Sequence, residues 1–378
     1  MRNVVIAGYV RSPFTPAKKG ELARVRPDEL AAQTVRALVE RTGVDPADVE
    51  DLLVGCAFPE GEQGFNVARI IGFLADLPLT VAGATVNRFC GSSMQSIHMA
   101  AGAIQWNAGE AFICAGVESM TRVPMGGFNP MPHPGLYQRY PQAFAAMGET
   151  AENLAKQRKI SRQRQEEFAL ASQQKTAAAI AAGRYDAEIV PITTKAGKVT
   201  KDGCPRPDTT LEGLAGLKLA FDEKGTVTAG TSSPVTDGAS AVLVCSEEYA
   251  HKKGLKPLAR VKSFAVSGCA PEIMGIGPVA ATQKALARAG LKLEQIDIVE
   301  LNEAFAAQSL AVVDELGLDP AKLNLDGGAI ALGHPLGASG ARIAGKAASL
   351  LQREKKRYAL ATMCIGGGQG IATILEAV

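Results

Sequence analysis

The sequence predicts an α/β fold in which one α/β unit occurs twice, with a further segment inserted between the copies. Three pairs of segments match at one offset: 49–58 with 296–305, 90–93 with 337–340, and 111–116 with 358–363. The offset is 247 residues, as from Phe58 to Phe305. Three matches at a single offset indicate a duplication. Each copy alternates apolar strands with helices, which is typical of a mainly buried sheet covered on both faces.

The composition is that of an ordinary globular chain, and 378 residues suffice for two or three domains of about 150 residues. With 47% hydrophobic and 21% charged residues, the sequence excludes a disordered or fibrous protein. The 40 basic and 38 acidic side chains nearly balance, at a net charge of +2. We therefore expect neither nucleic acid nor an acidic membrane surface as a partner.

No apolar run approaches the roughly 18–20 residues that a membrane helix needs, so we expect no membrane span. The start of the chain reads as a buried strand and not as a signal peptide. The seven cysteines include no CxxC pair and no histidine at zinc-site spacing. This pattern predicts free thiols, no bound metal and a cytoplasmic location.

The expected elements run in the same order in both copies: helix, strand, glycine-rich turn, helix, strand. Pro27 begins the first helix, because its fixed φ suits a first helical position, and Gly43 ends it. The apolar face of this helix consists of Leu30, Val35, Leu38 and Val39. In the second copy the segment 280–289 repeats the pattern, and Gly290 ends it.

Between the copies the sequence changes character. Prolines and glycines cluster at 124–135, and a long helix follows with Ser161 as its N-cap and Gly183 as its end. The segment 195–230 is irregular. We therefore expect an inserted loop domain that lies over the edge of the first half. The predicted boundaries are 1–118 for the N-terminal core half, completed by about 237–257, then 119–236 for the insertion and 258–378 for the C-terminal core half.

Four polar positions stand where a turn meets a strand or a helix, and the first of them is Cys90. It precedes a segment of helical character at 96–104. Free N–H groups and the dipole at a helix N-terminus favour the thiolate, which is the nucleophilic form of cysteine. Taken alone, a single cysteine is more often a small buried apolar residue.

The other three positions are His334, Cys364 and Asn302. His334 stands in a glycine-rich loop, where it can act as a base or serve as a structural turn residue. Cys364 ends a strand and enters the glycine run 366–370, whose N–H groups could hold an oxyanion. This run is not a phosphate loop, because no Gly-Lys-Ser/Thr follows. Asn302 could position a water, although asparagine at a strand end is commonly a turn former.

Together these motifs resemble the thiolase family. The block around Cys90 and the runs 302–306, 333–337 and 364–370 have the order, spacing and setting of thiolases, over essentially the whole chain. The resemblance implies the α/β, duplicated, five-layered αβαβα thiolase fold, with the inserted loop domain over the active site. It also implies an acyltransferase that moves acyl groups between a cysteine and coenzyme A, and that forms a homodimer or a homotetramer.

The resemblance implies a role for each of the four positions. Cys90 resembles the nucleophile that accepts the acyl group, and His334 the group that takes its proton and helps form an oxyanion hole. Cys364 resembles the acid/base that protonates the departing acetyl-CoA enolate and later activates CoA. Asn302 is similar to the residue that holds the water of the first oxyanion hole. The N–H groups of Cys90 and Gly366 resemble the second hole, and no permanently bound cofactor is implied.

Five further residues are expected to contact the substrate. Arg206 and Ser233 lie near positions that contact CoA in relatives, by a looser match. Met274 resembles a residue of the acyl pocket, where packing and substrate contact are both plausible. Met147, from the insertion, and Phe305, from the 302–306 run, complete the set.

Three departures narrow the type of thiolase. Biosynthetic short-chain thiolases resemble this chain except that they carry His-Met at 146–147 and Asn-Ala-Ser at 231–233. These segments, and 62–66, look closer to the β subunit of bacterial fatty-oxidation complexes. We therefore expect a 3-ketoacyl-CoA thiolase of β-oxidation, which cleaves 3-ketoacyl-CoA with CoA to acetyl-CoA and a shortened acyl-CoA. A fatty-oxidation α-subunit is then a candidate partner.

Three alternatives stay open from the sequence. The first is a short-chain acetyl-CoA acetyltransferase, also called acetoacetyl-CoA thiolase. A non-catalytic CoA-binding scaffold would be favoured by the loss of Cys90 or Cys364, yet both are present. A ketoacyl synthase shares the duplicated fold but uses a Cys-His-His set, which Asn302 and the second cysteine disfavour.

Overall fold

The computed structural model describes residues 2–378, which contain a ten-stranded sheet system in the order β10-β11-β12-β9-β1-β8-β5-β3-β4, with the short β2 attached to β8. The strands of the first half are β1 (Val4–Arg11), β2 (Thr15–Pro16), β3 (Val49–Gly55), β4 (Ala82–Val86), β5 (Ala111–Ser119) and β8 (Thr236–Ser246). Those of the second half are β9 (Ala259–Gly268), β10 (Ile298–Leu301), β11 (Tyr358–Ile365) and β12 (Gln369–Glu376).

The strand order repeats itself on either side of the pair β1–β9. The run β1-β8-β5-β3 in the first half corresponds to β9-β12-β11-β10 in the second. In both runs the last two strands pair in parallel and the others antiparallel. The half-sheets are joined where Val5 and Ile6 pair with Arg260 and Ala259. The duplication predicted from the sequence offset is therefore present in the fold.

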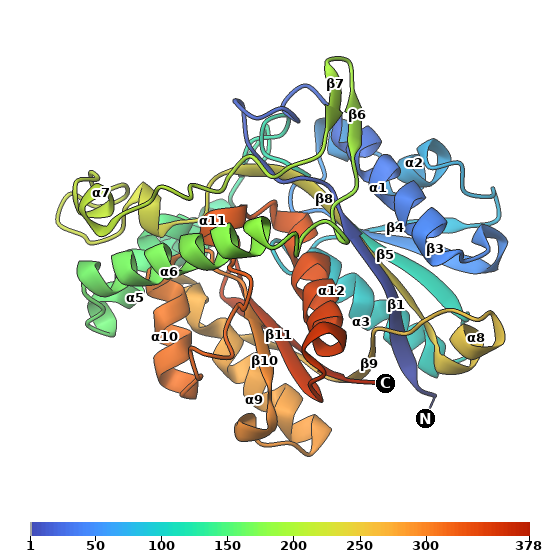
Figure 1. Cartoon of the computed structure of the whole chain (residues 1–378). Helices are drawn as coiled ribbons and strands as arrows, with labels where there is room; N and C mark the ends of the chain where they lie inside the picture. Colours follow the sequence, from blue (N-terminus) through green and yellow to red (C-terminus); the bar gives the residue numbers. More distant parts are fainter. Residues whose placement is uncertain (1) are drawn as a thin grey trace.

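Helices on both outer faces and between the half-sheets complete five layers (Figure 1). The outer faces are covered by α1 (Pro27–Thr42) and α2 (Val67–Leu74) on the first half-sheet, and by α9 (Gly277–Ala289) and α10 (Ala306–Leu316) on the second. Between the half-sheets lie α3 (Ser92–Gln105) and α12 (Leu336–Glu354), which contact both. The layer order αβαβα confirms the expected architecture. Within residues 2–378, no helix is long and apolar enough to cross a membrane.

Three apolar cores lie between these layers, and alternate side chains of a strand enter different cores. In β1, Val5 and Val10 face the outer core beneath α1, whereas Ile6 and Tyr9 face the inner core around α3 and α12. The alternation changes parity along the strand because a β-bulge lies between Ile6 and Gly8.

The predicted helix ends are confirmed. α1 ends before Gly43, whose φ is +68°, and α9 ends before Gly290, whose φ is +66°. Glycine adopts this left-handed backbone without the steric cost that other residues meet. In the insertion, Ser161 Oγ accepts a hydrogen bond from the Arg164 N–H (3.2 Å) and so caps α6 (Arg162–Ala181). That helix ends two residues before the glycine predicted to end it.

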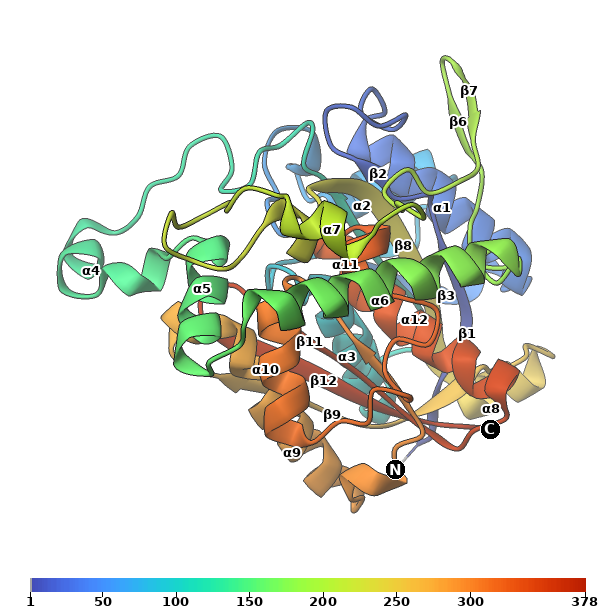
Figure 2. The same ribbon diagram turned by 60° about the vertical axis from the view of Figure 1, so that its left-hand side comes forward.

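The prediction that the inserted segment lies over the edge of the first half holds for 187–199, which pack beneath α1, but is wrong for its helices, which pack on the second half. α5 (Met147–Gln157) and α6 both pack against α10, and α6 also crosses α11 (Ala329–Leu332), as Figure 2 shows. The physical reason is the apolar stripe of α6, in which Ala169 joins a cluster with Ile330 of α11. The remaining elements are α4 (Pro134–Arg139), α7 (Leu211–Ala215) and the hairpin of β6 (Ile192–Thr194) and β7 (Gly197–Val199). The domain boundaries themselves stay a prediction.

Buried charges tie the inserted segment to both halves. The Arg11 guanidinium at the end of β1 lies 2.8 Å from Glu188 Oε1 and 2.7 Å from Asp202 Oδ1. Lys346 of α12 reaches the other oxygen of Glu188 (3.0 Å) and Asp326 Oδ2 (2.7 Å). Burial alone would raise the pKa of Asp326, but hydrogen bonds from a neighbouring arginine and the charge of Lys346 outweigh it and lower the pKa to about 2. The network holds the segment around Glu188 and Asp202 against β1 and α12.

Replacing Arg11 by methionine is expected to lower the free energy of unfolding by about 3–5 kcal/mol, because the carboxylates of Glu188 and Asp202 then stay buried without their guanidinium. The control is Arg164→Met, since Arg164 pairs with Asp314 at the surface and such pairs contribute at most about 1 kcal/mol. Urea unfolding at pH 7, followed by circular dichroism, measures both variants. Equal losses in the two variants would contradict the structural role of the buried network.

Candidate active site

Cys90 lies on the loop between β4 and α3, and Gly91 is the N-cap of that helix. Its side chain is partly buried, and the backbone N–H of Gly366 lies near enough to the thiol to affect its pKa. Burial raises the pKa of Cys90 to about 12, and the N–H groups of Gly366 and of Cys90 itself offset this only in part. The backbone N–H groups therefore act in the predicted direction, towards the thiolate, but burial opposes them and has the larger effect.

His334 stands on the turn between α11 and α12, where its backbone N–H donates to Thr236 Oγ1 (3.1 Å). Its ring Nδ1 lies 2.5 Å from Ser339 Oγ, and the Ser339 hydroxyl donates to Pro335 O (3.1 Å). With its only hydrogen used on that carbonyl, Ser339 Oγ accepts from Nδ1–H, which leaves the lone pair on Nε2. Burial lowers the pKa of His334 to about 3, and Arg342 adds to the effect. The ring is therefore neutral at pH 7.

Asn302 follows β10 and is fully buried. Its Nδ2 donates to His334 Nε2 (3.3 Å), while its Oδ1 has no hydrogen-bond partner within residues 2–378. A buried polar atom without a partner costs free energy, so Oδ1 marks a place for a water or a polar group of a ligand. The neighbouring Glu303 holds this loop, because its carboxylate accepts from Ser172 Oγ (2.6 Å) and Asn324 Nδ2 (2.7 Å).

Cys364 is the penultimate residue of β11, and its buried thiol lies beside that of Cys90. Burial raises the pKa of Cys364 well above its usual value, and the neighbouring Cys90 raises it further. Three glycines follow the strand, and Gly368 has a φ of +79°. A Cβ there would collide with the carbonyl oxygen of Cys269. Only glycine therefore permits the turn that presents the Gly366 N–H to Cys90.

Three of the five predicted substrate contacts lie together against Cys364. Met274 and Phe305 belong to one buried apolar cluster with Cys364, and Met147 packs against it. The other members are small: Ala151, Ala155, Val227, Ala304 and Ala307. Ser233 is anchored next to this cluster, because its backbone N–H donates to the carbonyl of the residue before Phe305 (3.0 Å). These four predicted residues thus share one side of the site.

The loops that carry Cys90 and His334 meet through packing, since Cys90 contacts a cluster that contains Leu336. Arg206, by contrast, lies apart from the residues predicted with it. Its backbone N–H donates to Gln173 Oε1 (2.9 Å), and its exposed guanidinium has no partner in the described part of the chain. The structure thus places Cys90 beside Cys364 and Asn302 beside His334, and packing at Leu336 relates the two pairs, whereas Arg206 lies apart; the roles of these residues stay predictions.

The sequence did not single out three side chains that also line the site. The Phe221 ring meets Phe305 edge-on at 5.8 Å between centroids. Phe89 and Met147 flank Gly366, within 3.6 and 3.5 Å of where its Cβ would lie. Ser339 is the third of these side chains. The sequence could have indicated it, because at the offset of 247 residues it corresponds to a serine close to Cys90. For Phe221 and Phe89 the sequence holds no such indication, since their role depends on contacts across the fold.

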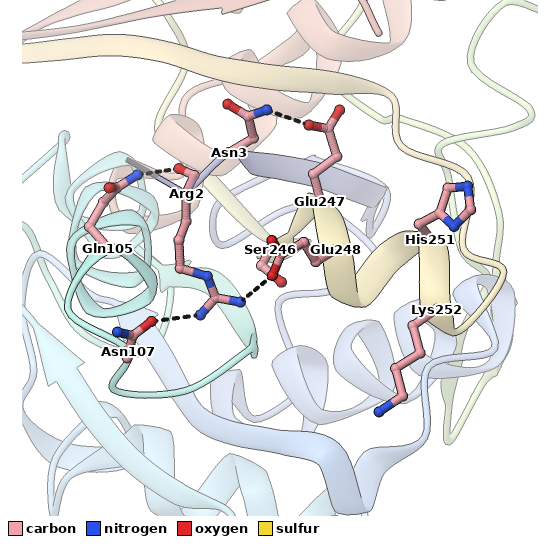
Figure 3. Close-up of a pocket in the computed structure, with 9 residues that line it drawn as sticks. All are labelled: Arg2, Asn3, Gln105, Asn107, Ser246, Glu247, Glu248, His251 and Lys252. Carbon is pink, nitrogen blue, oxygen red and sulfur yellow. Dashed lines mark hydrogen bonds and ion pairs between the residues drawn. The ribbon is translucent and has the colours of Figure 1, made fainter.

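A surface cavity of about 770 Å³ lies elsewhere, beside α8 (Glu247–Lys252) and the start of β1 (Figure 3). Its polar groups largely satisfy one another: Arg2 bonds to Asn107 Oδ1 (3.2 Å), and Asn3 Nδ2 to Glu247 (2.6 Å). None of the predicted catalytic residues lines it, so it is not part of the site. Across the described chain, no group of three His, Cys, Asp or Glu side chains is arranged to hold a metal ion.

Two family models match nearly the whole chain. The model described as "Thiolase, N-terminal domain" matches residues 4–248, and the model described as "Thiolase, C-terminal domain" matches residues 255–377. The 3-ketoacyl-CoA thiolase of Aliivibrio fischeri is 50% identical over 386 residues, with all of both chains covered. That of Bacillus subtilis is 45% identical over 389 residues, again with full coverage of both.

Solved structures show the same likeness. Human mitochondrial 3-ketoacyl-CoA thiolase in complex with CoA has a TM-score of 0.92 and 40% identity, over 100% of this chain and 98% of the other. The acetyl-CoA acetyltransferase of Bacillus anthracis has a TM-score of 0.92 and 41% identity, over 100% of this chain and 99% of the other.

The imidazole of His334 is expected to stay neutral between pH 5 and 8, because burial holds its pKa at about 3. NMR of protein labelled with 15N-histidine should show an Nδ1–H tautomer that does not titrate in this range, assigned by its loss in His334→Asn. Ser339→Ala should disturb the tautomer, whereas Ser349→Ala on the same helix should not, since Ser349 bonds only to a backbone carbonyl. Protonation of His334 near pH 6.5 would falsify the assignment.

Proposed function

The chain belongs to the thiolase family, and we propose that it is a 3-ketoacyl-CoA thiolase that works through an acyl intermediate on Cys90. Its αβαβα layers are the thiolase fold. The reaction cleaves 3-ketoacyl-CoA with CoA into acetyl-CoA and an acyl-CoA shortened by two carbons. The observation that carries the proposal is the meeting of two thiols, Cys90 and Cys364, beside the Gly366 N–H, on a loop that packs against Leu336 next to the turn of a neutral His334.

In the first step Cys90 attacks the 3-keto carbon of the substrate. With a pKa of about 12 the thiol needs a base, and we assign this task to His334 Nε2, whose lone pair gives up the hydrogen bond from Asn302 Nδ2 (3.3 Å) to take the proton. The proton passes from Sγ to Nε2 as the sulfur–carbon bond forms. Because both groups are neutral beforehand, neither the thiol nor the imidazole carries a buried charge in the resting site.

Two sets of donors then stabilise the oxygens that gain charge. The N–H groups of Cys90 and Gly366 converge at the Cys90 sulfur and suit the oxygen on the carbon that it attacks. His334, once protonated at Nε2, donates to the thioester oxygen of the departing acetyl-CoA enolate. A water held by the partnerless Oδ1 of Asn302 is the second donor to that oxygen.

Cys364 serves as the acid and then as the base. The bond between C2 and C3 of the substrate breaks, and its electron pair is protonated at C2 by the Cys364 thiol, which releases acetyl-CoA. The Cys364 thiolate next takes the proton of the incoming CoA thiol, whose sulfur attacks the acyl group on Cys90. The Cys90 sulfur leaves and recovers its proton from His334. The position of Cys364 beside Cys90 supports this double use.

The apolar cluster on Cys364 supports a substrate with an aliphatic acyl chain. Met147, Met274 and Phe305 line it, and its alanines leave width for a chain. We assign Ser233 and the unpartnered guanidinium of Arg206 to CoA, as co-substrate, and propose that no other cofactor stays bound. The second candidate function is a short-chain acetyl-CoA acetyltransferase, which the likeness to the Bacillus anthracis enzyme favours.

We also propose that the protein works in the cytoplasm as a homodimer or homotetramer. The strand at one end of the sheet, β4, has no neighbour on its outer side. Next to it in sequence, Phe65 and Leu79 are 95% and 78% exposed. A bare edge strand with apolar side chains is a surface that a second copy can cover by strand pairing. Association with a fatty-oxidation α-subunit stays a prediction from the sequence.

The wild type is expected to turn over 3-ketodecanoyl-CoA with CoA strongly, and Cys90→Ala to lose at least about 10³-fold in kcat because the acyl acceptor is gone. Cys245→Ala is the control, since Cys245 lies in the outer core beneath α1. Cleavage of the 3-ketoacyl thioester is followed by its absorbance, and acetoacetyl-CoA is assayed in parallel as a second substrate. Activity confined to acetoacetyl-CoA would move the assignment to the short-chain enzyme. CoA binding without turnover of either substrate would instead indicate a scaffold.

Charged residues on the proposed edge are expected to separate the subunits. The double variant Phe65→Glu/Leu79→Glu should sediment as a monomer of 39.4 kDa, whereas the wild type should sediment as a dimer or tetramer. Ile180→Glu, at an apolar and half-exposed position at the end of α6, is the control and should leave the assembly intact. An unchanged sedimentation coefficient in the double variant would place the interface elsewhere.

A further inference from the structure

A buried carboxylate that takes no part in the steps above lies where the two halves meet. Glu118 is the penultimate residue of β5 and only 1% exposed. Its Oε2 accepts hydrogen bonds from the backbone N–H groups of Ala57 and Gly337, each at 2.8 Å. Its Oε1 accepts from the Phe58 N–H (3.2 Å) and from Gln63 Nε2 (3.0 Å). The Cys56 thiol is a fifth, more distant donor to Oε1 (3.8 Å). All five partners are uncharged donors, which suits the ionised, acceptor-only form of the carboxyl. Burial raises the pKa of Glu118, and the hydrogen bonds that it accepts oppose this rise.

Three of these donors belong to the segments that surround the nucleophile. Ala57 and Phe58 follow β3, and Gly337 is the second residue of α12, just beyond the His334 turn. The side chains of Ala57, Phe58 and Leu336, the neighbour of Gly337, all pack in the cluster that Cys90 contacts. One carboxylate from β5 therefore fixes the backbone on two sides of the thiol, one side from each half of the chain.

We propose that Glu118 is a positioning residue of the acyl-transfer site, which sets the place of the loop after β3 and of the start of α12 relative to the Cys90 thiol. Glu118 touches neither the substrate nor the reacting atoms, and it acts through the backbone groups that it holds. The inference rests on the proposed thiolase activity only for its kinetic readout, because the geometry and the reactivity of Cys90 can be tested without a thioester substrate.

The carboxylate also places a negative charge near the nucleophile. After burial, the charge of Glu118 contributes to the raised pKa of Cys90. The other titratable groups around Cys90 are Cys364 from β11 and His334 before α12, both neutral, and Arg88, whose guanidinium turns to Gln369 Oε1 (2.9 Å). Burial is the main reason that the Cys90 thiol stays protonated, and the charge of Glu118 adds to it from the side of β5.

Two substitutions separate the position of the carboxyl from its charge. Glu118→Gln keeps the shape, removes the charge and replaces an acceptor by a donor, whereas Glu118→Asp keeps the charge but withdraws it by one methylene group. The readouts are kcat and KM for thiolysis, and the pH midpoint for alkylation of Cys90 by iodoacetamide, measured by mass spectrometry of the Cys90 peptide. The control is Asp297→Asn, which alters a carboxylate that also accepts two backbone N–H bonds but lies at the opposite ends of β10 and β11.

Both Glu118 variants are expected to lose about 10- to 100-fold in kcat with KM nearly unchanged, as for a misplaced catalytic group. Only Glu118→Gln should move the alkylation midpoint, to lower pH, and Asp297→Asn should change neither quantity. Wild-type kcat in either variant overturns the proposal, as does an unmoved midpoint in Glu118→Gln. If Glu118→Gln does not fold, Glu118→Asp decides by its kcat. If the wild type cleaves no thioester, the proposed function fails while the alkylation midpoints still test Glu118.

Discussion

The site depends on a close approach of the two halves that only glycine allows. Where α3 and α12 begin, a Cβ on Gly116 would collide with the carbonyl oxygen of Gly337, and a Cβ on Gly340 would collide with the backbone of α3. Because α3 follows Cys90 and α12 follows His334, this contact brings the loop of the thiol and the loop of the imidazole to one place. The duplicated fold thereby supplies two equivalent loops. The proposed reaction uses a cysteine on one loop and a histidine on the other.

Burial is the second constraint on the site, and it shifts the pKa of an acid and that of a base in opposite directions. Burial raises the pKa of Cys90 and Cys364 and lowers that of His334, so all three groups are neutral at pH 7. Charge appears only when a proton passes from a thiol to the imidazole. The Gly366 N–H and the amide of Asn302 are already oriented by then, and prearranged donors in a dry site stabilise new charge without reorganisation.

Local signals in the sequence were enough to predict the helix ends and the duplication, and they singled out Cys90 and Cys364, which lie side by side, and Asn302 and His334, which share a hydrogen bond. Features that depend on distant partners were not predictable: the bulge after Ile6, the bond from Ser339 to His334, and Glu118, which meets Gly337 across 219 residues of chain. Two features that the sequence analysis missed have the same origin. Neither the docking of α6 on α10 nor the burial of Cys90 can be derived from a short stretch of residues, because both are properties of the packed chain.

Buried charges occur in two arrangements here, and each suits its place. Around Arg11 and Lys346, cations and anions alternate. These ion pairs hold the inserted segment in place, and because opposite charges are adjacent, their net electrostatic field is weak. Beside Cys90 the anion is Glu118, whose partners are N–H groups and an amide without net charge. A cation there would cancel the carboxylate and stabilise a thiolate, and so make Cys90 reactive in the absence of substrate. Because the partners of Glu118 are neutral dipoles, they do not cancel its charge. That charge helps to keep the Cys90 thiol protonated until His334 takes the proton.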